Sequence, residues 1–246
     1  RVTGEMTAGD LHAIHAGEIA ALLEGELRGM QNLGATEVDL TLCLPPGFRV
    51  ENLAPEGMRQ EGNQLRFRLG AMAHGAKRTL ALRLTPSERA GPGPWLFEAA
   101  LRGTVPSTRE AMPMQHAVLR LDPASSVAEA RAARSEAAVR EVAEHWLADT
   151  TRRVTHANRG GHVNLAVLQA EAQAFREYCV GVAGTERLAE AMTALCNNAE
   201  RQWSEADRKL AHMASMKFQR SEAVYALRED LLGTLEDTLR RTSDES

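Results

Sequence analysis

The amino-acid sequence predicts an α+β protein in which an antiparallel β-sandwich is followed by an α-helical bundle of three to four long helices. Two observations lead to this prediction. Between residues 36 and 122, apolar side chains recur at every second position in short segments that turn residues separate. Beyond Pro123 they recur at every third or fourth position, which is the spacing of an amphipathic helix.

The first predicted strand shows the two-residue alternation most clearly. From Val38 to Leu44 every second side chain is apolar, and Pro45-Pro46-Gly47 ends the segment. Such a strand buries one face and leaves the other in water. Comparable segments occur at residues 48–53, 64–69, 78–84, 94–101 and 116–121.

The helical half begins at a recognisable capping sequence. Ser126 and Glu129 have the Ser-x-x-Glu spacing of a capping box, which predicts a helix over residues 127–157. A second helix is predicted over residues 163–180, a third and longer one over 185–220, and a last amphipathic segment over 221–240. An earlier amphipathic helix is predicted over residues 10–30.

The order of these segments resembles a known family. Residues 9–14, Gly-Asp-Leu-His-Ala-Ile, and the helix that follows are similar to the last strand and final helix of a von Willebrand factor A (VWA) domain. Residues 38–50, 65–70 and 77–84 resemble the β-sandwich that follows this domain in bacterial relatives. The resemblance implies three parts: the end of a VWA domain at 1–35, a sandwich at 36–122, and a helical bundle with a polar tail at 123–246.

The metal site of that family has no counterpart in this sequence. VWA domains hold a divalent metal ion with an Asp-x-Ser-x-Ser loop, and the nearest sequence here, residues 122–126, has alanine at its third position. The resemblance therefore places the metal upstream of Arg1 and implies no cofactor within this chain. We expect the chain to be the C-terminal portion of a longer protein.

Composition narrows the classes of partner. The net charge is −4 and the isoelectric point is near 6.1, so no overall positive field attracts nucleic acid, which is unlikely as the principal partner. Three widely spaced cysteines indicate neither a disulfide framework nor a thiolate metal cage. The sequence contains no membrane-spanning apolar run and no secretion signal, which predicts a cytoplasmic protein.

Three residues near the start could bind a metal. His12, His15 and Glu18 lie three apart and would share one helix face, so a metal-dependent hydrolase is one alternative function. Their spacing is not that of the metalloprotease motif, and a solvated helix start explains the same residues. No nucleophile or phosphate-loop motif occurs, and we therefore expect no enzyme.

The remaining candidates suggest binding. Arg152, Arg153 and Arg159, with His156, cluster near the end of the first long helix, where they suit the helix dipole or could bind phosphate, acidic peptide or, as a further alternative, nucleic acid. Further candidates for partner contacts are the apolar residues Met213, Met216, Leu231 and Leu235. The predicted function is a non-catalytic protein-interaction or scaffolding region in a multi-component bacterial assembly, with a role in defence or signalling as one setting.

Overall fold

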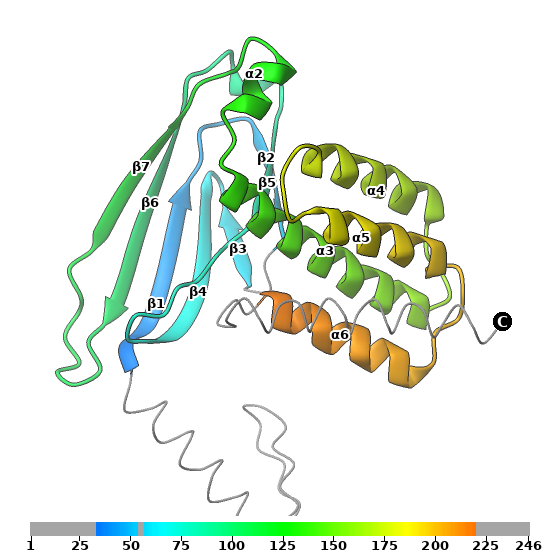
Figure 1. The fold of residues 1–246 in the computed structure, drawn as a ribbon. Coiled ribbons are helices and arrows are strands. Elements are labelled where there is room, and N and C mark those ends of the chain that lie inside the picture. The colour runs from blue at the N-terminus through cyan, green and yellow to red at the C-terminus, as the bar shows by residue number, and fades with distance from the viewer. Residues whose placement is uncertain (1–32, 54–56, 220–246) are drawn as a thin grey trace, which may run out of the picture. The chain divides into compact units, whose positions relative to one another are not determined.

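A computed structural model describes residues 33–53 and 57–219, and its α+β class agrees with the prediction (Figure 1). Contacts between Cα atoms divide the chain into two compact units. Of the described residues, the first unit comprises 33–44, 57–76 and 96–119, and the second comprises 45–53, 77–95 and 120–219. Each unit is described by itself.

A five-stranded antiparallel sheet dominates the first unit. The strand order is β3-β4-β1-β6-β7, and the central strand β1 pairs with β4 on one side and β6 on the other. The strands are β1 (Leu33–Cys43), β3 (Met58–Glu61), β4 (Gln64–Ala73), β6 (Trp95–Thr104) and β7 (Gln115–Leu121).

One face of this sheet is apolar and the other is charged, as the alternation predicts. Leu40 of β1 lies opposite Phe67 of β4 and Leu101 of β6. The preceding residue, Asp39, lies opposite Arg68 of β4 and Arg102 of β6. The apolar face contains the buried side chains Val38, Leu65, Phe67 and Phe97.

Among the described strands, β3 is the one that the sequence did not predict. Its four residues, Met-Arg-Gln-Glu, contain a single apolar side chain, so no alternation is visible. It forms because Gly62 adopts a positive φ of 60° in the turn that folds β3 back on β4.

The second unit contains a two-stranded sheet and the helices. Strand β2 (Phe48–Asn52) pairs antiparallel with β5 (Leu82–Pro86), with Val50 opposite Leu84. The strand predicted at 78–84 thus begins later and ends later than expected. Leu53 and Ala81, at the end of this pair, are buried in the same apolar cluster as the helices, so these two strands belong to the helical core.

Five described α-helices follow, and the single helix predicted over residues 127–157 is in fact two. They are α2 (Val127–Ala132), α3 (Glu136–Arg159), α4 (Leu165–Cys179), α5 (Glu186–Asn198) and α6 (Glu205–Gln219). The break between α2 and α3 arises because Ser135 caps a new helix, its Oγ accepting from the Ala138 backbone N–H.

The predicted capping box is confirmed, with one difference. Ser126 Oγ accepts from the backbone N–H of Glu129 at 3.1 Å, as expected for the cap of α2. The Glu129 carboxylate, however, accepts from the backbone N–H and the hydroxyl of Ser125, one residue before the position in the standard box.

The prediction of one helix over residues 185–220 is wrong, because the chain turns between α5 and α6. Asn158 of α3 donates from Nδ2 to the carbonyl oxygens of Ala199 and Arg201, and its Oδ1 accepts from the backbone N–H of Trp203. These bonds satisfy backbone groups that a helix would otherwise pair. The turn lets α6 run back beside α3 (Figure 1).

The helical core has the apolar composition that the periodicity predicts. Trp146 and Trp203 are both buried, as predicted; Trp146 lies on α3 as expected, whereas Trp203 lies in the turn between α5 and α6 and not on a helix. The core also contains Leu147, Leu168, Phe175, Leu188, Met192 and Leu195. Within the described residues, every helix is too short or too polar to cross a lipid bilayer.

Candidate functional site: a basic groove between α3 and α6

Basic side chains from α3 and α6 surround one cavity of about 520 Å³, here called the basic groove. Its lining residues are Arg152, Arg153, Thr155, His156, Arg159, Glu205, Arg208, Lys209 and His212. Five of these are permanently cationic at neutral pH and one is acidic. The concentration of positive charge is notable because the chain as a whole carries a net charge of −4.

Helical geometry explains why these residues meet. On α3, Arg152, His156 and Arg159 follow one another at intervals of four and three, so they share one face of the helix. On α6, Glu205, Lys209 and His212 repeat the same intervals, and Arg208 lies three residues after Glu205 and four before His212. Because α3 and α6 pack side by side, the two faces form the walls of one groove.

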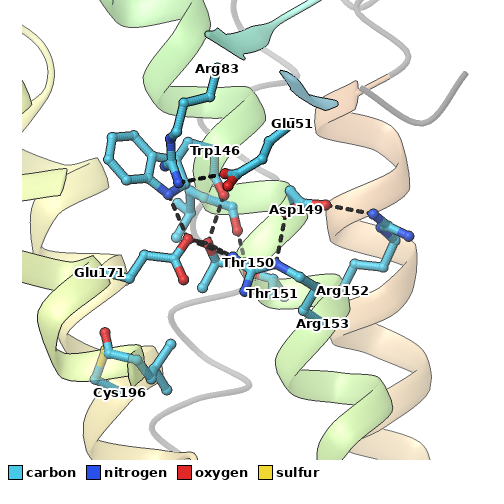
Figure 2. A network of polar contacts seen from close by, with 12 residues as sticks. Glu51, Arg83, Trp146, Asp149, Thr150, Thr151, Arg152, Arg153, Glu171 and Cys196 are labelled. Atoms are coloured by element: carbon cyan, nitrogen blue, oxygen red, sulfur yellow. Dashed lines mark hydrogen bonds and ion pairs between the residues drawn. The ribbon is translucent and has the colours of Figure 1, made fainter. Parts of the chain in front are cut away.

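Two carboxylates with little solvent exposure lie behind the α3 wall (Figure 2). Asp149, whose side chain is 7% exposed, accepts from Arg152 and, at 2.8 Å, from Nε of Arg153. Glu171 of α4, with a side chain 10% exposed, accepts from the other end of the Arg153 guanidinium. Arg153 is therefore held at both ends, while its side chain remains 46% exposed toward the groove.

Glu171 has two further donors. Its carboxylate accepts from Trp146 Nε1 at 2.7 Å and from the Thr150 hydroxyl at 3.0 Å. Burial by itself would raise the pKa of Glu171, but hydrogen bonds from Trp146 and Arg153 and the charge of Arg153 outweigh it, so the pKa lies below its usual value. Glu171 is consequently a carboxylate at neutral pH.

The indole of Trp146 is fixed on its other side by the β2–β5 pair. The Arg83 guanidinium lies 4.0 Å above the ring centroid, in cation–π geometry, and donates to Glu51 at 3.0 Å. Figure 2 shows Arg83 and Glu51 together beside the indole, opposite the Glu171 side. A chain of contacts thus runs from β5 through Trp146 and Glu171 to Arg153.

The α6 wall is also arranged by ion pairs. Glu205 accepts from Arg208 at 3.1 Å and from Arg159 of α3 at 3.3 Å, so it links the two walls. The hydrogen bond from Arg208 and the neighbouring positive charges lower the pKa of Glu205. Lys209 is exposed, and none of the described residues forms an ion pair with it.

Charge in the groove is therefore only partly neutralised. Five cationic side chains line it, and within residues 33–53 and 57–219 three carboxylates pair with them, namely Asp149, Glu171 and Glu205. Arg152 and Arg159 keep 43% and 67% of their side chains exposed. A site of this kind attracts an anion, and its arginine donors suit carboxylate or phosphate oxygens.

The structure brings together some of the predicted site residues. Arg152, Arg153 and Arg159, singled out from the sequence, all line the groove. Sequence reasoning missed Arg208, Lys209 and His212, although their spacing of one and three residues marks a basic helix face. It could not pair that face with α3 because the α5–α6 turn was not foreseen.

Other candidates lie elsewhere. Met213 is 54% exposed on α6, outside the groove lining. The helix containing Met216 is described, but its side chain is not. His12, His15 and Glu18, the metal candidates, and Leu231 and Leu235 fall outside the described residues.

Two cysteines lie in the helical unit. Burial raises the pKa of the Cys179 and Cys196 thiols, which opposes formation of the thiolate. No group of three or more His, Cys, Asp or Glu side chains is placed to hold a metal ion within residues 33–53 and 57–219.

Comparisons of the chain with protein families, with curated proteins and with solved structures find no match.

Proposed function

We propose that this chain is a non-catalytic protein-interaction region that binds an acidic segment of a partner protein in the basic groove. The observation that carries the proposal is the pair of basic helix faces on α3 and α6, which supply five cations around one cavity. Opposite charge on the partner would orient the encounter and fix the register.

An acidic protein segment fits the groove better than nucleic acid does. Nucleic-acid binding depends on neutralising many phosphates and is favoured by a positive surface extending well beyond one pocket. Here the positive charge of the groove comes from two helix faces around one cavity, in a chain whose net charge is −4. A short run of aspartate and glutamate has a similar extent and the opposite charge.

The network behind the groove supports a preorganised binding site. Arg153 is held by Asp149 and Glu171, and Arg159 is held by Glu205. Ordering a free arginine costs about 0.5–1.5 kcal/mol on binding, and an arginine already held by a carboxylate loses less. The same network protects the two buried carboxylates from being left unpaired.

The wider setting follows from the family resemblance. We place the chain at the C-terminal side of a VWA domain, in a cytoplasmic multi-component bacterial assembly, where the sandwich and the helical bundle together serve as scaffold. The two antiparallel sheets and the helices support this proposal, as do three cysteines that form no disulfide.

Binding of a fluorescently labelled short polyglutamate peptide, followed by anisotropy at low salt, tests the proposal. The double variant Arg159→Gln, Lys209→Gln removes two exposed charges of the groove without touching the buried carboxylates. Affinity should fall about tenfold, because each exposed charge pair contributes up to about 1 kcal/mol. Added salt should weaken binding by the wild-type chain.

A matched control removes the same charge elsewhere. The variant Arg66→Gln, Arg68→Gln alters two exposed arginines of β4 and should bind the peptide as the wild type does. Equal losses in both double variants would show that only net charge matters and would refute a groove site. Tighter binding of single-stranded DNA than of the peptide, lost in the groove variant, would favour the nucleic-acid alternative instead.

A further inference from the structure

The positive charge of the basic groove is compensated at one end and not at the other. On the α3 side, Arg152 and Arg153 pair with two carboxylates, Asp149 and Glu171 (Figure 2). Two positive and two negative charges balance there. This end of the groove has no surplus charge to attract an anion.

At the other end, three cations surround one carboxylate. Glu205 pairs with Arg208 at 3.1 Å and with Arg159 at 3.3 Å, and none of the described residues forms an ion pair with Lys209. The hydrogen bond from Arg208 and the charges of Arg159 and Lys209 lower the pKa of Glu205, so all three cations act on this one group. Among the described residues, a surplus of two positive charges is therefore concentrated at this end.

The three cations border the same cavity from both walls of the groove. Arg208 is fixed in place, because it donates to the backbone carbonyl of Trp203 at 2.7 Å and its side chain is only 16% exposed. Arg159 comes from the opposite wall, with 67% of its side chain exposed, and Lys209 is also exposed. Donors from α3 and α6 can thus reach one ligand group together.

We propose that the acidic segment bound in the groove carries a phosphorylated serine or threonine, whose phosphate lies against Arg159, Arg208 and Lys209. This inference rests on the proposed function and specifies its ligand. A phosphorylated side chain carries about −1.5 to −2 charges at neutral pH and has three strong acceptor oxygens, so one such group matches the surplus. Arginine suits phosphate oxygens through its paired N–H groups, and lysine suits them as a point charge.

Carboxylates match this distribution of charge less well. Side chains on one face of an extended segment lie about 7 Å apart, so a run of glutamates spreads its negative charge along the groove. Part of that charge would lie beside Arg152 and Arg153, where the charges already balance. A phosphate places two negative charges at one point.

The size of the groove favours a phosphorylated segment over a free phosphate ion. The cavity measures about 520 Å³, and Thr155, His156 and His212 line it beyond the three cations. Pockets of this size hold ligands much larger than one phosphate. The remaining space can take the residues on either side of the phosphorylated one.

Three labelled peptides test the inference on the whole chain. They have the sequence Glu-Ala-X-Ala-Glu, where X is phosphoserine, glutamate or serine. Anisotropy at low salt and about pH 7.5, where phosphoserine is mostly a dianion, should give the phosphoserine peptide a dissociation constant at least about fivefold below that of the glutamate peptide. The serine peptide should bind most weakly. Inorganic phosphate should displace the phosphoserine peptide only far above the dissociation constant of that peptide.

Two single variants locate the phosphate. Lys209→Gln lowers the surplus from two charges to one and should reduce the preference for phosphoserine over glutamate to less than about twofold. The matched variant Arg152→Gln removes one charge from the balanced end and should weaken both peptides while preserving the preference.

The outcomes separate this inference from the proposed function. Equal binding of the phosphoserine and glutamate peptides, or an equal loss of preference in both variants, would overturn the inference and leave an acidic-segment site in place. Displacement by inorganic phosphate at the dissociation constant of the peptide would also overturn it, in favour of the free ion. Failure of both acidic peptides to bind would overturn the proposed function as well.

Discussion

Replacement of Asn158 by alanine tests the turn that places α6 beside α3. Asn158 is 6% exposed, and its amide makes three hydrogen bonds to the backbone of the α5–α6 turn. Its Nδ2 donates to the carbonyl oxygens of Ala199 and Arg201, at 3.3 and 2.6 Å. Its Oδ1 accepts from the backbone N–H of Trp203 at 3.1 Å.

The expected cost follows from these three bonds. Each net hydrogen bond contributes about 0.5–1.5 kcal/mol, and a buried backbone group left without a partner costs about 1–3 kcal/mol. We therefore expect Asn158→Ala to lower the free energy of unfolding by about 2–4 kcal/mol. Asn158→Asp should cost at least as much at neutral pH, because a carboxylate would face two carbonyl oxygens in a buried position.

Urea unfolding followed by tryptophan fluorescence measures this loss, with Trp203 in the turn itself as one reporter. With a slope of about 1–3 kcal/mol/M, the midpoint should fall by roughly 1–2 M. Asn197→Ala, at an exposed position of α5, is the matched control and should change stability by less than about 0.5 kcal/mol. A loss for Asn158→Ala no larger than that of the control would refute the account of the turn.

Three further predictions concern the carboxylates behind the groove. Glu171→Gln removes the charge that Arg153 pairs with at a site 10% exposed, and should destabilise the fold by about 1–3 kcal/mol in urea unfolding. The pKa of Glu171 in the folded chain lies below the reference value of 4.5, so its contribution to stability is complete above pH 4.5 and is lost as the pH falls through the folded pKa. The thermal unfolding temperature of the wild type should drop over that acidic range, and that of Glu171→Gln should drop less steeply. Asp149→Asn removes a negative charge beside the groove, which makes its net charge more positive, but it also frees Arg152 and Arg153 from their ion pairs with Asp149. We therefore expect weaker polyglutamate binding by anisotropy. Tighter binding of that variant would show that net charge outweighs preorganisation.

Much of the secondary structure could be predicted because its cause is local. The alternation in β1 and the Ser126 cap of α2 are both readable within a few residues, and both are present. Strand β3 was missed since its formation depends on pairing with β4 rather than on its own sequence. The α5–α6 turn was missed for a similar reason, because its backbone partners come from Asn158, some forty residues earlier.

The candidate site shows the same division between local and distant causes. The arginines of α3 form a cluster in the sequence itself, whereas the second wall needs α6 to turn back on α3. Arg83 alternates with the apolar Leu82 and Leu84, which places it on the polar face of its strand, yet it lies half-buried over Trp146. Alternation predicts that one face of a strand is polar, and it does not predict that an aromatic ring from a helix lies against that face.

The buried carboxylates explain how two basic helix faces can lie together at all. Bringing Arg152, Arg153 and Arg159 close to Arg208 and Lys209 costs free energy through repulsion between like charges. Asp149 and Glu171 reduce this repulsion by pairing with the arginines of α3. Glu205 reduces it by pairing with Arg159 of α3 and Arg208 of α6. Among the described residues these carboxylates are fewer than the cations, so repulsion between the cations remains, and the proposed acidic ligand would relieve it on binding. If the groove binds an acidic partner as proposed, stability should rise when the polyglutamate peptide is present.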